Sequence, residues 1–288
     1  MQINANGTML AVEEYGPKDG LPLILVRGLG SSLIHWPKNF VQGFADLGYR
    51  TVIYDNRDAG LSQRFPMRDH PSDSASLKQI IADGGALPVP YSLADHVQDC
   101  VGLMDELGIN RAHLFAISMG GGIAQSFATS FADRLLSATL VMTSARLRSA
   151  ALLGGMLAKR RSRSDYIDAM VAEDQVWGSP GYPMTEAEIR EQAAQAYDRG
   201  YDPDAYNRQI LGLAAAEERV ERLQKLDLPC FVIHGAEDTL VPPEAGRELA
   251  SLIPGAKLEI IKGMGHTITP LLAPKLVAMV DGFIRGQG

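Results

Sequence analysis

The segment AHLFAISMGG, residues 112–121, decides the fold because it predicts a buried strand, a sharp turn and a helix in immediate succession. Residues 112–117 form a short, mostly apolar run of the length typical of a strand. From Ile123 onward, apolar side chains recur at three- and four-residue spacing, which predicts a helix. Small residues flank Ser118, as a strained strand-to-helix turn requires, so this serine is a candidate nucleophile. On this motif alone, an ordinary glycine-rich helix start remains the alternative.

Strand and helix patterns alternate along most of the chain. Asn6-Gly7 lies between two short strand patterns and predicts an N-terminal antiparallel hairpin, because Asn-Gly readily adopts positive φ. The irregular, proline-containing stretch 62–91 is expected to be a binding loop or a mobile segment. Alternation elsewhere predicts an α/β fold with a mostly parallel central sheet and helices on both faces. The expected strands after the hairpin are 21–26, 51–54, 112–117, 138–142, 230–233 and 258–261, and the expected helices are 40–47, 92–107, 123–131, 244–252 and 272–284.

Residues 149–226 interrupt this alternation with several helical periods and no strand pattern. They include a capping box formed by Thr185 and Glu188. The 288 residues suffice for one large α/β domain with an insertion. The expected organisation is a core of residues 1–148 and 227–288, with residues 149–226 inserted in it as a helical cap.

Composition excludes several classes of partner. The formal net charge is −7 and basic residues are mostly scattered, which argues against nucleic acid or an anionic membrane surface. The N-terminus has neither a basic start nor an apolar core, and no run is long enough to span a membrane, so a cytoplasmic location is expected. The protein is expected to be a monomer or a homodimer. Cys100 and Cys230 fall in apolar patterns and are expected to be buried free thiols. No metal-binding spacing or phosphate loop occurs, so neither a metal nor a cofactor is expected.

Two further reactive side chains follow predicted strands. Asp238 comes after the strand at 230–233, and His266 comes after the strand at 258–261. Because reacting groups in parallel sheets gather at the carboxyl ends of the strands, Ser118, Asp238 and His266 are expected to meet. His266 would take the serine proton and return it to the leaving group, while Asp238 orients the imidazole.

A tetrahedral intermediate also requires hydrogen-bond donors for its negative oxygen. The backbone N–H groups of Leu29 and Met119 are the candidates for this oxyanion hole. Gly28, Gly30 and His35 are candidates for lining the same pocket.

The four segments with these residues resemble the α/β-hydrolase family over essentially the whole chain. Residues 54–62, YDNRDAGLS, resemble the Asp-x-Arg-x-x-Gly-x-Ser segment of many members, and together with RGLG at 27–30 they resemble the aclacinomycin methylesterase-like branch. Ala116 stands where the family usually has glycine, and Arg27 stands where many members have histidine. Neither departure removes a catalytic group.

The resemblance implies a cofactor-independent serine hydrolase that cleaves an ester of a small or medium carboxylic acid through an acyl-enzyme, with carboxylesterase as the first interpretation. Similar members include lactonases, carbon–carbon bond hydrolases, and perhydrolases also described as cofactor-free haloperoxidases. A non-catalytic small-ligand receptor of the same fold is the alternative from another class.

Other polar residues have structural interpretations. Glu237 is expected to be a solvated loop acid, and His234 a satisfied, partly buried residue. Ion pairs that brace loops are expected of Asp55, Arg57 and Asp58, with Arg27 a candidate for the same network. Surface or packing positions are expected of His70, His96 and His113.

Two groups of residues in the expected cap have two interpretations each. The basic cluster at 159–163 is either a solvated helix face or a bias toward anionic substrates. The methionines are either packing residues or flexible pocket lining, and they are Met156, Met170 and Met184.

Overall fold

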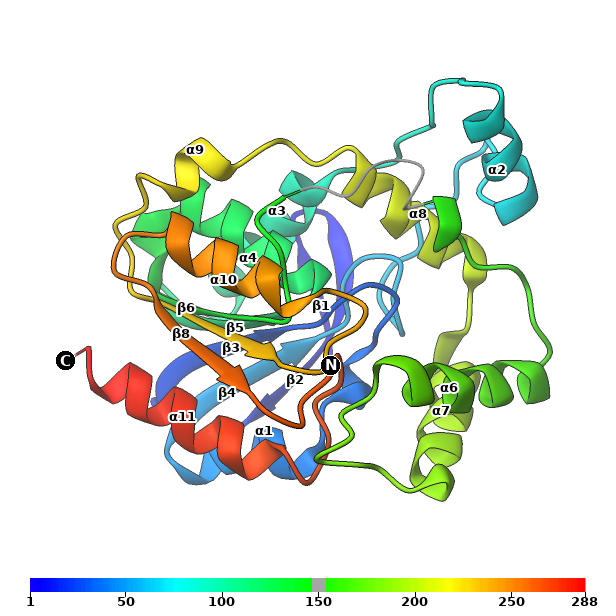
Figure 1. Ribbon diagram of the computed structural model, residues 1–288. Coiled ribbons are helices and arrows are strands. Elements are labelled where there is room, and N and C mark those ends of the chain that lie inside the picture. The colour runs from blue at the N-terminus through cyan, green and yellow to red at the C-terminus, as the bar shows by residue number, and fades with distance from the viewer. Residues whose placement is uncertain (147–153, 288) are drawn as a thin grey trace.

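The computed structural model describes residues 1–146 and 154–287. Its centre is an eight-stranded sheet with strand order β1-β2-β4-β3-β5-β6-β7-β8 (Figure 1). β1 pairs antiparallel with β2 and β2 antiparallel with β4, whereas all other neighbours are parallel. The predicted α/β fold with a mostly parallel sheet is confirmed. The strands are β1 Gln2–Ala5, β2 Thr8–Tyr15, β3 Leu21–Val26, β4 Tyr49–Tyr54, β5 Ala112–Ile117, β6 Leu135–Val141, β7 Cys230–Gly235 and β8 Lys257–Ile261.

Helices cover both faces of the sheet and enclose two apolar cores (Figure 1). One face packs against α1 and α11, and the other against α3, α4 and α10. These helices are α1 Lys38–Asp46, α3 Leu93–Glu106, α4 Met119–Ser130, α10 Pro243–Leu252 and α11 Ala273–Arg285, with short 3-10 turns η1 Leu33–His35 and η2 Ala132–Arg134.

The N-terminal hairpin turns at the predicted dipeptide. Asn6 and Gly7 have φ values of 54° and 72°, and Ala5 pairs with Thr8 across the turn. These are the positive φ values that a two-residue hairpin turn requires. The prediction from Asn-Gly is confirmed.

Between β6 and β7, the described part of the chain is helical and contains no strand. The capping box of Thr185 and Glu188 is present at the start of α7. The expected start of the cap at residue 149 lies outside the described residues. The helices of this helical insertion, described over residues 154–226, are α6 Arg163–Trp177, α7 Glu186–Gly200, α8 Pro203–Ala214 and α9 Val220–Leu223.

The stretch 62–91 is less irregular than expected, because it contains α2, Ser74–Ala82. The side chain of Asp73 caps this helix by accepting a hydrogen bond from the backbone N–H of Ser76 at 2.9 Å. Leu77 is the one buried residue of α2, so the apolar periodicity that reveals most helices is weak here. The prediction of an irregular segment was wrong at this point.

Cys100 and Cys230 are buried and free, as expected. None of the described helices combines the length and the apolar character needed to cross a membrane.

Candidate active site

Ser118 occupies the turn between β5 and α4 in a strained conformation, with φ 53° and ψ −121°. Positive φ at a residue with a side chain costs on the order of 1–3 kcal/mol, so the surroundings must hold it in place. The backbone N–H of Ser118 donates to the carbonyl oxygen of Val141 at 3.0 Å, and its carbonyl oxygen accepts from Thr143 Oγ1 at 2.8 Å. Bonds on both sides of the residue therefore fix the turn that presents the hydroxyl.

Glycines near this turn allow a close approach of backbone segments. A Cβ atom on Gly120 would lie 2.5 Å from the carbonyl oxygen of Val26, a distance that real Cβ atoms do not adopt. A Cβ atom on Gly28 would lie 3.0 Å from the Cβ of Ser118. The small residues of both segments thus let the loop after β3 lie against the serine turn.

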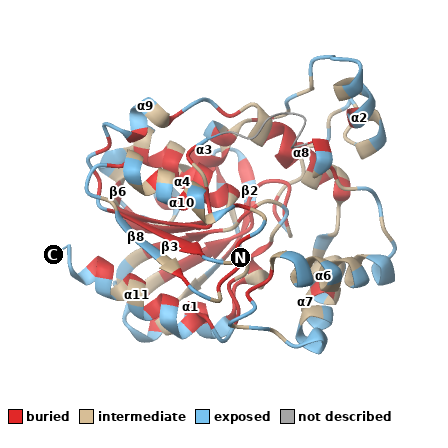
Figure 2. Ribbon diagram, in the orientation of Figure 1, coloured by how far each residue is buried: buried red, intermediate tan, exposed pale blue. Residues whose placement is uncertain are grey.

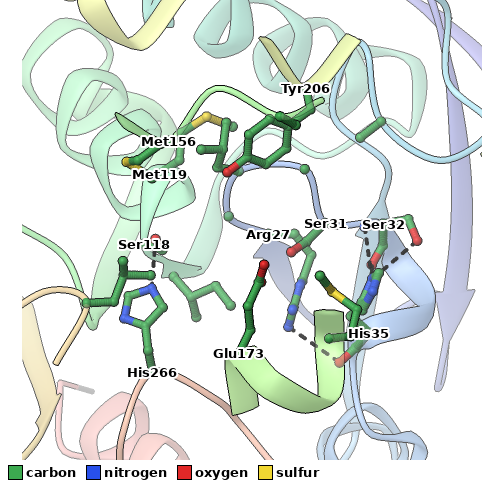
Figure 3. A pocket seen from close by; sticks show the side chains of 18 of the residues that line it. Arg27, Ser31, Ser32, His35, Ser118, Met119, Met156, Glu173, Tyr206 and His266 are labelled. Atoms are coloured by element: carbon green, nitrogen blue, oxygen red, sulfur yellow. Dashed lines mark hydrogen bonds between the residues drawn. The ribbon is translucent and has the colours of Figure 1, made fainter. Parts of the chain in front are cut away.

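The structure brings Ser118, His266 and Asp238 together from three strand ends. His266 Nε2 lies 3.0 Å from Ser118 Oγ (Figure 3). On its other side, His266 Nδ1 lies 2.7 Å from Asp238 Oδ2. A histidine whose Nδ1–H donates to the carboxylate has Nε2 free to accept the serine proton. This is the geometry of a nucleophile, a general base and an orienting acid.

Asp238 is buried and surrounded by donors that favour its charged form. Its Oδ1 accepts from the backbone N–H groups of Leu240 at 3.0 Å and Val241 at 2.8 Å. Burial raises the pKa of this carboxyl, but the contacts with His234 and His266 and the backbone N–H of Val241 outweigh it and lower the pKa to about 2. The carboxylate therefore stays ionised and can stabilise a protonated His266.

Two neighbours of the acid differ from expectation. His234 is fully buried rather than partly buried, and its Nε2–H donates to the carbonyl oxygen of Val241 at 2.8 Å while its Nδ1 has no partner. Glu237 is half-buried rather than solvated, because its Oε2 accepts from the backbone N–H of Gly263 at 2.7 Å. Both residues brace the loops that present Asp238 and His266.

The helical insertion contacts these two loops at the C-terminal end of α6. The backbone N–H of His266 donates to the carbonyl oxygen of Trp177 at 2.7 Å, and Gly265 N–H donates to Ser179 Oγ at 3.0 Å. Thr239 Oγ1, next to Asp238, donates to the carbonyl oxygen of Val176 at 2.7 Å. The segment that ends α6 is therefore bonded to both loops.

The candidate oxyanion donors lie on either side of the serine. The N–H of Met119 is the first of α4 and has no partner within the helix. Leu29 lies in a loop where Gly28 O accepts from Ser31 N–H at 3.3 Å and Gly30 N–H donates to Gln209 Oε1 at 2.8 Å. Gln209, from α8, thus fixes the loop beside Leu29.

Ser118 lines a cavity of about 730 Å³, whose walls include the loop after β3 and the helical insertion. His35 lines it, and burial together with the nearby Arg27 lowers the pKa of this histidine to about 4, so it is neutral at pH 7. Figure 3 shows Met156 and Tyr206 on the wall near Met119. The predicted site residues that line the cavity are Gly28, Leu29, Gly30, His35, Ser118, Met119 and His266, together with the methionines Met156, Met170 and Met184.

The ion pairs expected in the segment after β4 are present. Asp55 pairs with Arg199 at 2.6 Å, and Arg57 pairs with the buried Asp99 at 2.7 Å. Asp58 forms two hydrogen bonds with an arginine of α8, the shorter at 2.7 Å. The loops are therefore joined to α3, to α7 and to α8.

Arg27 does not join this network. Its guanidinium lies 4.5 Å from the centre of the Trp36 ring, and its Nη1 donates to the carbonyl oxygen of His35 at 3.4 Å. Trp36 belongs to the apolar core on the face of the sheet opposite the one that contains Val26, so the Arg27 guanidinium lies on that face. The expectation of an ion pair at Arg27 was wrong.

The remaining histidines and the basic cluster have ordinary surroundings. His70 is exposed, His96 is buried against Tyr91, and His113 Nδ1 lies 2.7 Å from Ser137 Oγ. The arginines of the cluster pair with acids of the insertion, as Arg160–Asp204, Arg161–Glu173 and Arg163–Asp198.

Three residues of the insertion were missed by the sequence analysis, namely Arg199, Arg208 and Gln209. Gln209 Nε2 donates to the carbonyl oxygen of Arg57 at 2.7 Å, in addition to its bond with Gly30. These partners are more than 140 residues away along the chain, and no local spacing signals such contacts. Among the described residues, no group of three or more His, Cys, Asp or Glu side chains is arranged to hold a metal ion.

Comparisons with known proteins found a matching family model and several relatives. A family model described as "alpha/beta hydrolase fold" matches residues 22–269. The chain is 25% identical to rhodomycin D methylesterase DauP of Streptomyces sp. (strain C5), over 95% of this chain and 94% of the relative. It is also 25% identical to 2-hydroxymuconate semialdehyde hydrolase of Pseudomonas putida, over 98% of this chain and 93% of that protein. The solved enol-lactonase from Burkholderia xenovorans LB400 is similar with a TM-score of 0.78 and 25% identity, over 99% of this chain and 100% of that one.

Proposed function

Because the chain belongs to the alpha/beta hydrolase fold family, we propose that it is a serine hydrolase that cleaves carboxylic esters with Ser118, His266 and Asp238. The observation that supports this proposal most strongly is the pair of contacts made by His266, at 3.0 Å to Ser118 Oγ and at 2.7 Å to Asp238. Catalysis by a serine nucleophile requires a general base in contact with the hydroxyl and a third group, here a carboxylate, that orients the base.

In the acylation step, Ser118 Oγ attacks the ester carbonyl carbon while His266 Nε2 takes the hydroxyl proton. The resulting oxyanion accepts hydrogen bonds from the N–H groups of Met119 and Leu29, each worth on the order of 3 kcal/mol of barrier. His266 then protonates the leaving alcohol, and the C–O bond breaks to give the acyl-enzyme.

Deacylation repeats these roles with water. His266 removes a proton from the attacking water, a second tetrahedral intermediate forms, and the proton returns to Ser118 Oγ as the acid leaves. Asp238 stays ionised throughout, because its pKa of about 2 lies far below the working pH. It stabilises the imidazolium in both steps.

The relatives also favour a second candidate, lactone opening. A lactone is a cyclic ester, so Ser118 would attack its carbonyl carbon and the same donors would stabilise the oxyanion. The similar solved structure is named an enol-lactonase. Carbon–carbon bond hydrolysis and perhydrolysis on the same triad are further alternatives, and a ligand receptor is the alternative without catalysis. In each enzymatic case, the core at residues 1–148 and 227–288 supplies the reacting groups, and residues 149–226 act as a cap over the substrate.

The test is turnover of p-nitrophenyl acetate and butyrate. We expect release of p-nitrophenol by the unaltered protein and loss of at least a thousandfold in kcat for Ser118→Ala. Ser126→Ala, on the same helix but away from the cavity, is the matched control and should keep full activity. If the unaltered protein and Ser118→Ala were equally inactive on a broad panel of esters and lactones, the alternative of a non-catalytic ligand receptor would be favoured.

The pH profile gives a second test of the base. Because His266 must be neutral to accept the serine proton, kcat/KM should rise with the loss of one proton as the pH increases. A kcat/KM that falls as the pH increases would contradict this role.

A further inference from the structure

Arg27 is a charged side chain in the cavity wall that lacks a carboxylate partner. It follows β3 directly and begins the loop that contains Leu29. Its one hydrogen bond, from Nη1 to the carbonyl oxygen of His35, is long at 3.4 Å, and its Nε is buried without a partner. Within the described chain, no carboxylate oxygen lies within the 4.0 Å that defines an ion pair with this guanidinium.

Three buried arginines of the described chain have stronger partners than the half-buried Arg27. Arg57 and Arg208 each bind an aspartate through two hydrogen bonds. Arg219 lacks a carboxylate but donates to an amide oxygen at 2.8 Å and to a backbone carbonyl oxygen at 3.1 Å. Arg27 is therefore the least satisfied of these four cations.

The guanidinium is nevertheless charged at neutral pH. Burial lowers the pKa of Arg27 to about 9, which still leaves the group protonated. The ring of Trp36 at 4.5 Å compensates part of the lost hydration through a cation–π contact. An unpaired cation in a partly dry site is costly, so an anion that entered the cavity would be bound favourably.

The position of Arg27 places such an anion close to the reacting groups. The residue that follows it, Gly28, is so near the nucleophile that a Cβ there would lie 3.5 Å from Ser118 Oγ. Figure 3 shows Arg27 beside Ser31 and His35, across the cavity from Ser118 and His266. The half-buried Arg27 thus faces the same space as the candidate nucleophile.

Three acids of the insertion also line this cavity, namely Glu173, Asp174 and Asp202, and Asp202 lies 3.7 Å from both Arg64 and Arg208. Glu173 belongs to α6, and its nearest cationic partner is Arg161, with Oε1 and Nη1 3.8 Å apart. Burial raises the pKa of the Glu173 carboxyl. Glu173 pairs with Arg161 and not with Arg27, so α6 gives the Arg27 guanidinium no carboxylate partner.

We infer that Arg27 binds a carboxylate of the substrate, so that the preferred esters contain a free carboxylate in addition to the ester group. This inference rests on the proposed ester hydrolysis and narrows its substrate class. The planar guanidinium is suited to this ligand because it donates several hydrogen bonds in a fixed geometry.

The experiment compares charged and neutral esters of equal length. Mono-p-nitrophenyl glutarate against p-nitrophenyl pentanoate tests a carboxylate on the acyl side, and the butyryl ester of 4-hydroxybutyrate against butyl butyrate tests the alcohol side. We expect at least a tenfold preference in kcat/KM for the anionic ester in one of the two pairs. Arg27→Met should reduce that preference at least tenfold, and Arg27→Lys should retain part of it.

Arg160→Met is the matched control, because Arg160 is an exposed cation of the insertion and does not line the cavity. It should leave the preference between charged and neutral esters unchanged. If Arg27→Met does not fold, inhibition of the unaltered protein supplies the readout. Glutarate should then inhibit at least tenfold more strongly than glutaramide, and added NaCl should weaken the inhibition.

Two outcomes separate this inference from the proposed function. Ser118-dependent hydrolysis of neutral esters without any preference for anionic esters would overturn the role of Arg27 and leave ester hydrolysis intact. An unchanged preference in Arg27→Met would overturn it as well. Failure to hydrolyse every ester would contradict the proposed function itself.

Discussion

The helical insertion contains two regions of different character, α8 on one side and the α6–α7 pair on the other (Figure 2). Eight of the 12 residues of α8 are buried, including three polar ones, Asn207, Arg208 and Gln209. In contrast, α6 has no buried residue, and α7 has Ala193 alone. α8 is therefore mostly buried, although its Tyr206 also lines the cavity, whereas α6 and α7 line the cavity and bury almost no residue.

The bonds made by each region explain the difference. α8 binds the core through buried contacts, with Arg208 on Asp58 and Gln209 on the loop beside Leu29. Most ion pairs of α6 and α7 are exposed, as for Arg163–Asp198 at 2.7 Å, and the pair of Arg199 with the buried Asp55 at the end of α7 is the exception. We therefore expect changes in α8 to impair folding and catalysis, and changes in α6–α7 to affect substrate preference instead.

The largest effect is expected for a substitution in the core, at Asp238. Asp238→Asn removes the charge that supports His266, and kcat for p-nitrophenyl butyrate should fall by about 10³–10⁴. The neighbouring Glu237→Gln is the control, and it should lower kcat less than tenfold because its contact is with Gly263 rather than with the histidine. Comparable losses in both variants would show that the acid has been misassigned.

The second prediction compares one ion pair from each region. Arg208→Met leaves Asp58 buried and unpaired, which should lower the free energy of unfolding by about 3–5 kcal/mol. Arg163→Met breaks an exposed pair and should cost at most about 1 kcal/mol. Urea unfolding measures both, and equal effects would remove the distinction between α8 and α6–α7.

The third prediction concerns Gln209, whose Oε1 accepts a hydrogen bond from Gly30 in the loop that contains the candidate oxyanion donor Leu29. Gln209→Leu should lower kcat about tenfold for every ester with little change in KM, because a displaced Leu29 N–H stabilises the oxyanion less well. The matched control is Gln192→Leu, because Gln192 lines the cavity from α7. This variant should change KM by an amount that depends on the substrate. A change of KM alone in Gln209→Leu would assign this residue to substrate binding.

The smallest expected effect concerns acid stability. The pKa of Asp238 is about 2 in the folded protein against an ordinary value of 3.8, so its charge stabilises the fold above about pH 4. This contribution should disappear as the pH falls from about 4 toward 2, and the stability difference between the protein and Asp238→Asn should narrow over that range. A gap that is constant between pH 5 and 2.5 in urea unfolding would contradict the assigned pKa.

The two regions also differ in how far the sequence predicts them. The strand ends that hold Ser118, Asp238 and His266 were predictable, because a residue just after an apolar run has its position set by local structure and by the parallel sheet. The contacts of Arg208 and Gln209 were not, since each joins α8 to a loop about 150 or more residues away. Long-range polar pairs depend on packing that leaves no periodic pattern in the chain.

Arg27 and α2 illustrate the same limit. Arg27 was a candidate for the ion-pair network of Asp55, Arg57 and Asp58, but alternation along β3 directs its side chain to the face of the sheet with Trp36. The helix α2 has one buried residue, so its apolar pattern was too sparse to reveal it.

The central claim is that Ser118 is a nucleophile activated by His266, and covalent labelling tests it most directly. Incubation with diethyl p-nitrophenyl phosphate should add one diethylphosphoryl group per chain, mapped by mass spectrometry to Ser118, with none on Ser118→Ala and far slower labelling of His266→Ala. A protein that stays unlabelled, or one labelled equally fast without His266, would contradict the account.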